Sequence, residues 1–208
     1  MAKILQPEAN YTFRSIFELP NDPDEILAEF DYGYTQGRLA LPRTKKPLAG
    51  LDELKAQIEA SLPYVQLTSE VAKREVLVAP VLLRVAILSR QVLRFEYPLK
   101  VSNWLQGNLD YLIRAPQQVV VVEAKRDDLT RGFTQLAVEM IALSLVEEAP
   151  RYIYGAVTIG SFWVFGRLDR DAKLVTQDIG GYKVPDDLED LVRVLVGILD
   201  GSGDRETL

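Results

Sequence analysis

Val119-Val120-Val121-Val122-Glu123-Ala124-Lys125 is the stretch that decides the fold of this 208-residue chain. Four consecutive β-branched residues are typical of a strand that is buried on both faces of a sheet. Side chains two positions apart share one face of a strand, so Glu123 and Lys125 are expected to point the same way. The sequence therefore predicts an acid and a base together at the polar end of an otherwise apolar strand.

A second strand is predicted just upstream, from Asn108 to Arg114 (NLDYLIR), and a short turn at residues 116–118 joins it to the valine run. Pairing of the two strands as a hairpin would set Asp110 beside Glu123. Two neighbouring carboxylates repel each other, and a divalent cation relieves that repulsion. We therefore expect a cation site between these strands.

In the rest of the sequence, on both sides of these two strands, the hydrophobic periodicity predicts alternating helices and strands. Residues 1–50 look mostly irregular, with a short helix at 24–30. The other predicted helices cover residues 51–60, 69–89 (capped by Thr68 or Ser69 and kinked at Pro80), 129–146 and 188–199. The other predicted strands cover residues 92–97, 152–158, 162–165 and 174–176. This order predicts an α/β (mixed α+β) fold, a mixed β-sheet flanked by helices.

The composition excludes several kinds of site. The chain contains no His and no Cys. This excludes Ser-His-Asp and Cys-His catalysis, imidazole bases and zinc held by His or thiolate. Any metal must be held by oxygen, which favours Mg²⁺, Mn²⁺ or Ca²⁺. We find no signal peptide and expect no membrane-spanning segment, so a soluble, cytoplasmic protein is predicted.

The charge is unevenly distributed. The net charge of −6 argues against nucleic acid as a partner, but residues 70–135 carry 10 basic and 7 acidic side chains. This net-basic third also contains the candidate site, which favours an anionic ligand there. The alternative is an ordinary scatter of surface charge.

The segment Gly107–Ile113, followed by Val122-Glu123-Ala124-Lys125, resembles the core of the PD-(D/E)XK nuclease superfamily, with Leu109 in place of the Pro of the family name. The resemblance covers residues 68–165. This part of the chain is similar to the N-terminal nuclease domain of type I restriction subunits. It implies a restriction-endonuclease-like fold and a metal-dependent phosphodiester hydrolase, expected to be a DNA endonuclease. It also implies Mg²⁺ (or Mn²⁺) bound by Asp110, Glu123 and the backbone carbonyl of Ala124, with Lys125 orienting or deprotonating the attacking water.

The resemblance further implies that Glu70 reaches the metal through water, although Glu75 on the same helix competes for that role. The alternative for Glu70 is a first-turn acid stabilised by the helix dipole. Gln135 resembles a polar residue near the metal in the helix after Lys125. The alternative for Gln135 is a solvated helix face shared with Arg131 and Glu139.

Four further residues have two possible roles each. Arg126 and Arg131 could contact phosphates, or they could serve surface solubility. Trp104 and Tyr111 could stack on bases, or they could anchor the core and a loop.

The expected organisation is an N-terminal extension packing on the core (1–67), a nuclease-like core (68–200) and a flexible tail (201–208). Nucleic acid is the expected partner, with DNA favoured and RNA left open. A homodimer is also left open, because enzymes that cut both strands often act as symmetric dimers. Two alternatives to an enzymatic function remain open. One is a non-catalytic nucleic-acid-binding or assembly module on the same fold. The other is a structural domain in which Glu123 and Lys125 form a strand-end ion pair.

Overall fold

The computed structural model describes residues 4–116, 118–125, 127–146 and 150–201, with the backbone alone at residues 118–121. The helices are α1 (Phe13–Phe17), α2 (Pro23–Ala28), α3 (Leu51–Ser61), η1 (Leu62–Tyr64), α4 (Glu70–Lys73), η2 (Arg74–Val78), α5 (Ala79–Ser89), α6 (Leu129–Val146) and α7 (Leu188–Leu199). The strands are β1 (Gly33–Gly37), β2 (Leu93–Lys100), β3 (Gln106–Ala115), β4 (Gln118–Ala124), β5 (Tyr152–Thr158), β6 (Phe162–Asp169), β7 (Leu174–Asp178) and β8 (Tyr182–Lys183).

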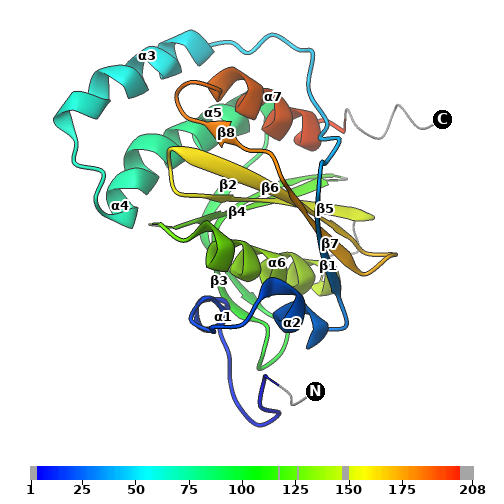
Figure 1. Ribbon diagram of the computed structural model, residues 1–208. Coiled ribbons are helices and arrows are strands. Elements are labelled where there is room, and N and C mark those ends of the chain that lie inside the picture. The colour runs from blue at the N-terminus through cyan, green and yellow to red at the C-terminus, as the bar shows by residue number, and fades with distance from the viewer. Residues whose placement is uncertain (1–3, 117, 126, 147–149, 202–208) are drawn as a thin grey trace.

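These strands form one mixed sheet flanked by helices, which confirms the predicted class (Figure 1). The strand order is β1-β7-β6-β5-β4-β3-β2, and β8 pairs with β6. The predicted hairpin is present, because β3 and β4 pair antiparallel with Tyr111 opposite Val122. β4 and β5 are parallel, and α6 is the crossover helix between them.

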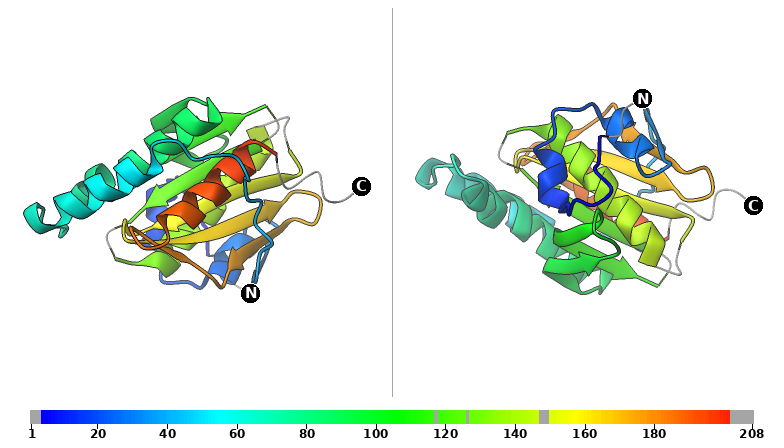
Figure 2. Two further views of the ribbon diagram at one scale, coloured as in Figure 1. Left: turned by 90° about the horizontal axis from the view of Figure 1, so that it is seen from above. Right: turned by 90° about the horizontal axis from the view of Figure 1, so that it is seen from below.

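Helices cover both faces of the sheet (Figures 1 and 2). α3, α5 and α7 lie over one face, and α1, α2 and α6 lie over the other. Each face has its own hydrophobic cluster, the first built around residues such as Val81 and Leu195 and the second around residues such as Phe133. The end of β4 is buried on both faces, since Val122, Glu123 and Ala124 are each at most 2% exposed. The side chains of residues 119–121 lie outside the described part.

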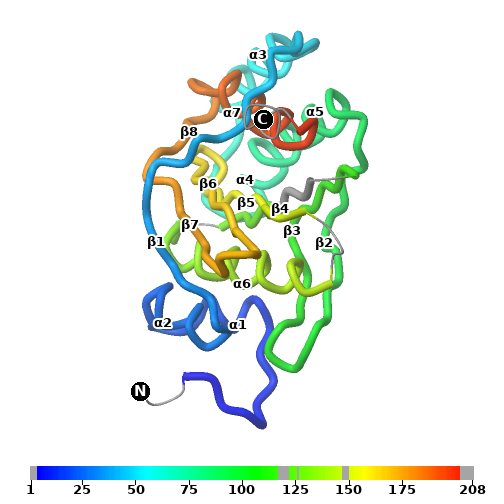
Figure 3. The backbone as a smooth tube through the Cα atoms, turned by 90° about the vertical axis from the view of Figure 1, so that its right-hand side faces the viewer, coloured from blue at the N-terminus to red at the C-terminus, as the bar shows by residue number. Residues whose placement is uncertain are grey.

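The N-terminal segment is more regular than its sequence indicated. Residues 1–50 were expected to be mostly irregular, but they contain α1, the expected α2 and the strand β1. β1 pairs parallel with β7 at the edge of the sheet, where the two strands run side by side (Figure 3). Residues 4–67 therefore pack on the core and also supply one of its strands. Of the predicted tail 201–208, all but Gly201 lies outside the described residues.

The predicted helix from residue 69 to 89 contains an irregular turn. Ser69 caps its start by accepting a hydrogen bond from the backbone N–H of Ala72 at 3.1 Å. Residues Arg74–Val78 then form a π-helical turn before α5 continues. Pro80 has no backbone N–H to donate into the preceding turn, which accounts for the irregularity.

α6 lies in the core. By length and composition this helix could cross a membrane, which differs from the expectation that no segment approaches such a span. However, 72% of this helix, Leu129–Val146, is buried inside the protein. A helix that is hydrophobic on nearly all sides is typical of a buried core helix, and the structure is consistent with a soluble protein.

Candidate functional site

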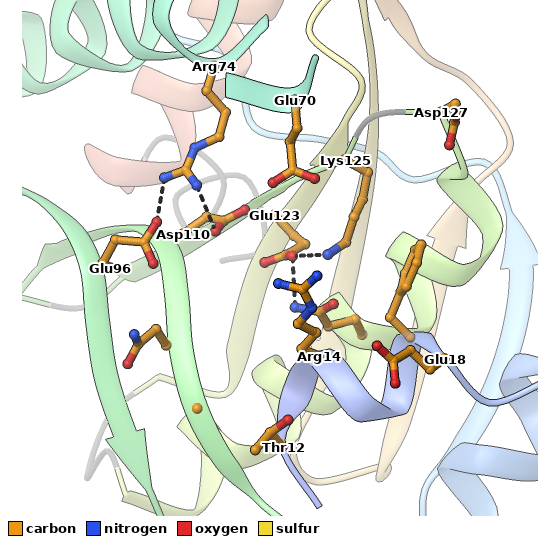
Figure 4. A pocket seen from close by; sticks show the side chains of 14 residues that line it. Thr12, Arg14, Glu18, Glu70, Arg74, Glu96, Asp110, Glu123, Lys125 and Asp127 are labelled. Carbon is orange, nitrogen blue, oxygen red and sulfur yellow. Dashed lines mark hydrogen bonds and ion pairs between the residues drawn. The ribbon is translucent and has the colours of Figure 1, made fainter. Parts of the chain in front are cut away.

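A cleft of about 620 Å³ opens where the ends of β3 and β4 meet α1 and α4 (Figure 4). It is lined by Thr12, Arg14, Phe17, Glu18, Glu70, Arg74, Glu96, Gly107, Asn108, Asp110, Glu123, Lys125, Asp127 and Gln135. The side chains expected to form the catalytic and metal site (Glu70, Asp110, Glu123, Lys125 and Gln135) all line this one cleft, whereas Trp104, Tyr111 and Arg131 do not. Of the two competing acids, Glu70 on α4 lines the cleft, whereas Glu75 on η2 is exposed and does not.

Glu123 and Lys125 form an ion pair at the end of β4. Lys125 Nζ lies 2.6 Å from Glu123 Oε1, and the two side chains are 11% and 2% exposed. The ring of Phe17 lies 4.6 Å from Lys125 Nζ, measured to the ring centroid. The stem of Lys125 passes close to Gly132 of α6, because a Cβ at Gly132 would lie 2.8 Å from Lys125 Cγ. The lysine is therefore held between α1 and α6 with its ammonium group on Glu123.

Gln135 and Glu139 extend this pair into the core. Gln135 Nε2 donates hydrogen bonds to Glu123 Oε1 at 2.7 Å and to Glu139 Oε1 at 2.9 Å. Gln135 is 4% exposed and Glu139 is fully buried, so the alternative of a solvated helix face is wrong for both. Only Arg131 of that predicted face is exposed, and it pairs with Asp128 at 3.6 Å.

Burial changes the protonation of this network. The pKa of Glu123 is raised to about 8, first by burial and then by repulsion from Asp110. Burial and the repulsion from Glu123 also raise the pKa of Glu139. Burial by itself lowers the pKa of Lys125, but the attraction and hydrogen bond of Glu123 outweigh it, so the net shift is upward. The lysine therefore stays charged while the two glutamates resist ionisation.

Asp110 lies beside this network on β3. Its Oδ2 accepts a hydrogen bond from the backbone N–H of Ala124 at 2.9 Å, and Arg74 Nη1 lies 3.4 Å from its Oδ1. Burial raises the pKa of Asp110, although the Ala124 hydrogen bond and the Arg74 charge oppose that shift. The hairpin thus places Asp110 against the backbone of the Glu-x-Lys segment.

Glu96 is a cleft residue that the sequence did not indicate. It lies on β2, and Arg74 Nη2 lies 2.6 Å from its Oε1, so that Arg74 bridges Glu96 and Asp110. Glu96 has a backbone φ of 47°, which is uncommon for a residue other than glycine and costs conformational energy. A left-handed residue inside a strand leaves no signature in the sequence. Glu139, by contrast, was expected only on the solvated helix face, although an acid in a helix that is apolar on nearly all sides is itself a signal of a buried polar site.

The two aromatic candidates have structural roles. Tyr111 is 2% exposed, and its hydroxyl accepts a hydrogen bond from Arg74 Nε at 3.3 Å. Trp104 anchors the N-terminal segment, because its Nε1 donates to the carbonyl of Gln6 at 3.2 Å. This confirms the core reading for Tyr111 and the loop-anchoring reading for Trp104. Arg126 lies outside the described residues.

The carboxylate oxygens of the cleft are the atoms that could bind a cation. Within the described ranges, no group of three or more acidic side chains is arranged to hold a metal ion. Mg²⁺ commonly needs only one or two carboxylates, because it keeps several waters and takes further oxygens from a phosphate. Asp110 supplies one carboxylate and Glu123 the other, and Glu123 Oε2 is buried without a hydrogen-bond partner among the described residues. A buried oxygen of this kind is costly unless something binds it, so the residues present fit a hard cation.

Comparison with protein-family models finds none that matches the chain, and comparison with curated proteins likewise finds no match.

Proposed function

We propose that this chain is a metal-dependent phosphodiester hydrolase that acts on nucleic acid, with DNA endonuclease activity expected. The observation that carries the proposal is the placement of Asp110, Glu123 and Lys125 in one cleft at the end of β4. The order of helices and strands around these residues supports the proposal. A helical segment (70–89) is followed by β2, β3, β4, α6 and β5, and β4 and β5 are parallel. This order is similar to the core expected of the PD-(D/E)XK superfamily.

The charge of the cleft lining supports a metal cofactor. Six of the lining side chains are acidic (Glu18, Glu70, Glu96, Asp110, Glu123 and Asp127), and three are basic (Arg14, Arg74 and Lys125). A phosphodiester would be repelled by this excess of carboxylates. A bound Mg²⁺ or Mn²⁺ would offset most of this excess negative charge, polarise a phosphoryl oxygen and lower the pKa of bound water.

The residues of the cleft divide the remaining work. Asp110, Glu123 and the carbonyl of Ala124 would hold the cation, and Glu70 would reach it through water. Gln135 fixes the orientation of Glu123 through its hydrogen bond to Oε1. Lys125 would orient the attacking water and stabilise negative charge developing at the phosphate. It is not suited to deprotonate that water, because Glu123 keeps its ammonium group charged.

A non-catalytic nucleic-acid-binding or assembly module is the second candidate. One observation favours it: Arg74 lies within ion-pair distance of Asp110, and it also holds Glu96. A guanidinium in this position could take the place of a cation beside Asp110. In that case the protein would bind nucleic acid in the presence of a chelator and would not cleave it.

Calorimetric titration with Mg²⁺ and Mn²⁺ tests the proposed function directly. We expect binding by the wild type, loss of binding in Asp110→Asn, and wild-type binding in Asp169→Asn. Asp169 is a suitable control because it pairs with Arg151 at 3.0 Å and does not line the cleft.

Cleavage of supercoiled plasmid DNA and of labelled RNA should then follow in the wild type and be lost in Lys125→Met. Cleavage that survives in both folded variants, Asp110→Asn and Lys125→Met, would rule out this site. Sedimentation of the purified protein tests the homodimer, which remains a prediction, as does the cytoplasmic location.

A further inference from the structure

The segment around α1 forms one wall of the cleft and is firmly anchored. Thr12 and Ser15 cap each other's backbone in a reciprocal capping box. Phe13 and Ile16 are each 1% exposed and belong to the hydrophobic cluster that contains α6. The backbone N–H of Tyr11 also donates to the carbonyl of Asn103 at 2.8 Å. A helix of five residues is not stable alone, so these contacts hold it in place.

This anchored segment supplies two charged side chains to the lining of the cleft, Arg14 and Glu18, of which Arg14 is the cation. Arg14 extends from α1 into the cleft, on the opposite side from Glu70 and Arg74, and its guanidinium points toward Glu123 (Figure 4). On the same helix, Phe17 packs against the ammonium group of Lys125. The N-terminal segment therefore contacts Lys125 through Phe17 and lines the cleft with Arg14.

Arg14 differs from the other two cations of the lining in its partners. Lys125 pairs with Glu123, and Arg74 pairs with both Glu96 and Asp110. Among the residues that the structure describes, none forms an ion pair or a hydrogen bond with the Arg14 side chain. An exposed arginine beside so many carboxylates, but bound to none of them, has all its donors available for a ligand.

We propose that Arg14 binds a phosphate group of the nucleic acid, so that the N-terminal segment is part of the ligand site. The planar guanidinium matches two phosphate oxygens with two parallel hydrogen bonds. Its position across the cleft from Glu70 directs these bonds at a backbone that enters between α1 and α4. The inference rests on the proposed function only in taking a phosphodiester as the ligand, and it does not require that the ligand be cleaved.

Fluorescence anisotropy with short labelled duplex and single-stranded DNA tests this inference. Ca²⁺ replaces Mg²⁺ in the assay to allow binding with little cleavage. We expect Arg14→Ala to weaken binding about tenfold, which is the effect of losing one charged hydrogen-bonding contact. The slope of log Kd against log salt should fall by about 1. Arg14→Lys should restore the salt slope but only part of the affinity.

Lys45→Ala is the matched control, because Lys45 is an exposed cation that does not line the cleft. It should bind DNA as the wild type does. Equal affinity and equal salt slope in Arg14→Ala and Lys45→Ala would overturn the inference, as would a wild type that binds neither probe. Thermal unfolding of each variant excludes a folding defect.

Parallel plasmid cleavage in Mg²⁺ separates this inference from the proposed function. Binding that depends on Arg14 without any cleavage supports the inference and contradicts the enzyme. Cleavage by the wild type with no effect of Arg14→Ala on binding supports the enzyme and contradicts the inference.

Discussion

Gly132 lies so close to Lys125 that a Cβ on the glycine would be 2.8 Å from the Cγ of the lysine. The same Cβ would lie 2.8 Å from Cγ2 of Val157 on β5. α6 can therefore approach β4 and β5 closely at this turn only if it has no side chain there. The position of the lysine in the cleft depends on that close approach.

Gly132→Ala should lower the free energy of unfolding by about 1–2 kcal/mol, because the overpacking outweighs the gain in helix propensity. It should also displace Lys125 and reduce DNA cleavage. Urea denaturation and plasmid cleavage measure the two effects. Gly37→Ala is the control, since a Cβ at Gly37 would meet no atom within 4 Å. A Gly132→Ala protein as stable and as active as this control would contradict the packing argument.

Lys125→Met should destabilise the protein more at about pH 8 than at about pH 5.5. The substitution keeps an unbranched stem but leaves the buried carboxylate of Glu123 without its cation. Breaking such a pair costs about 3 kcal/mol when the remaining charge cannot be neutralised. Protonation of Glu123 reduces the cost at the lower pH. Urea denaturation at both pH values measures the difference, and an equal loss at both would show that the pair contributes little.

The raised pKa of Glu123 predicts how stability depends on pH without a divalent cation. Its pKa is about 8 in the folded protein and 4.5 ordinarily, so between these values the folded state holds the proton more tightly. Its contribution to stability is therefore lost as the pH rises from about 4.5 to about 8. Glu123→Gln should lack this loss and become relatively more stable than the wild type as the pH rises.

Added Mg²⁺ should act in the opposite direction, because a cation binds the ionised carboxylate. The increase in Tm caused by Mg²⁺ should be larger at about pH 8 than at about pH 5.5. Differential scanning calorimetry of the wild type and Glu123→Gln measures both effects. If the Tm of the wild type and the Tm of Glu123→Gln changed equally with pH in the absence of Mg²⁺, the pKa of Glu123 would not be raised.

Glu139 should affect metal binding through Gln135. Glu139→Leu removes the second acceptor of Gln135 Nε2 and frees the amide that orients Glu123. Loss of such outer contacts commonly weakens metal binding, here by about tenfold. Glu139→Gln keeps an acceptor oxygen and should retain affinity close to that of the wild type. Calorimetry with Mn²⁺ compares the three proteins, and equal affinity in Glu139→Leu would show that Gln135 needs no second partner.

Much of this fold could be predicted from local sequence patterns. The valine run before Glu123 indicated β4, and the apolar periodicity from Leu129 to Val146 indicated α6. The grouping of Asp110 with Glu123 followed from a short turn between two strands, which is also local information. These predictions held because each depends on hydrophobic period or turn length rather than on distant packing.

The rest of the cleft depends on contacts between distant segments. Arg14 reaches the cleft because α1 packs on α6, more than a hundred residues later in the chain. The left-handed backbone of Glu96 and the burial of Glu139 likewise arise from the assembled core. Single-residue propensities do not contain this information, so the sequence predicted that residues 1–67 pack on the core but not that they line the cleft.

The parallel pairing of β1 with β7 has a consequence for folding kinetics. Gly33 lies opposite Leu174, and the hydroxyl of Tyr34 donates to Oε1 of Gln177 at 2.5 Å, across 143 positions of sequence. Contacts at such separation raise contact order and form slowly, because a long loop must close first. A ribosome must therefore synthesise most of the chain before β1 can join the sheet. The β3–β4 hairpin with Asp110 and Glu123 can form much earlier, because its strands are close in sequence. During synthesis, these two carboxylates should therefore come together before β1 pairs with β7 at the edge of the sheet.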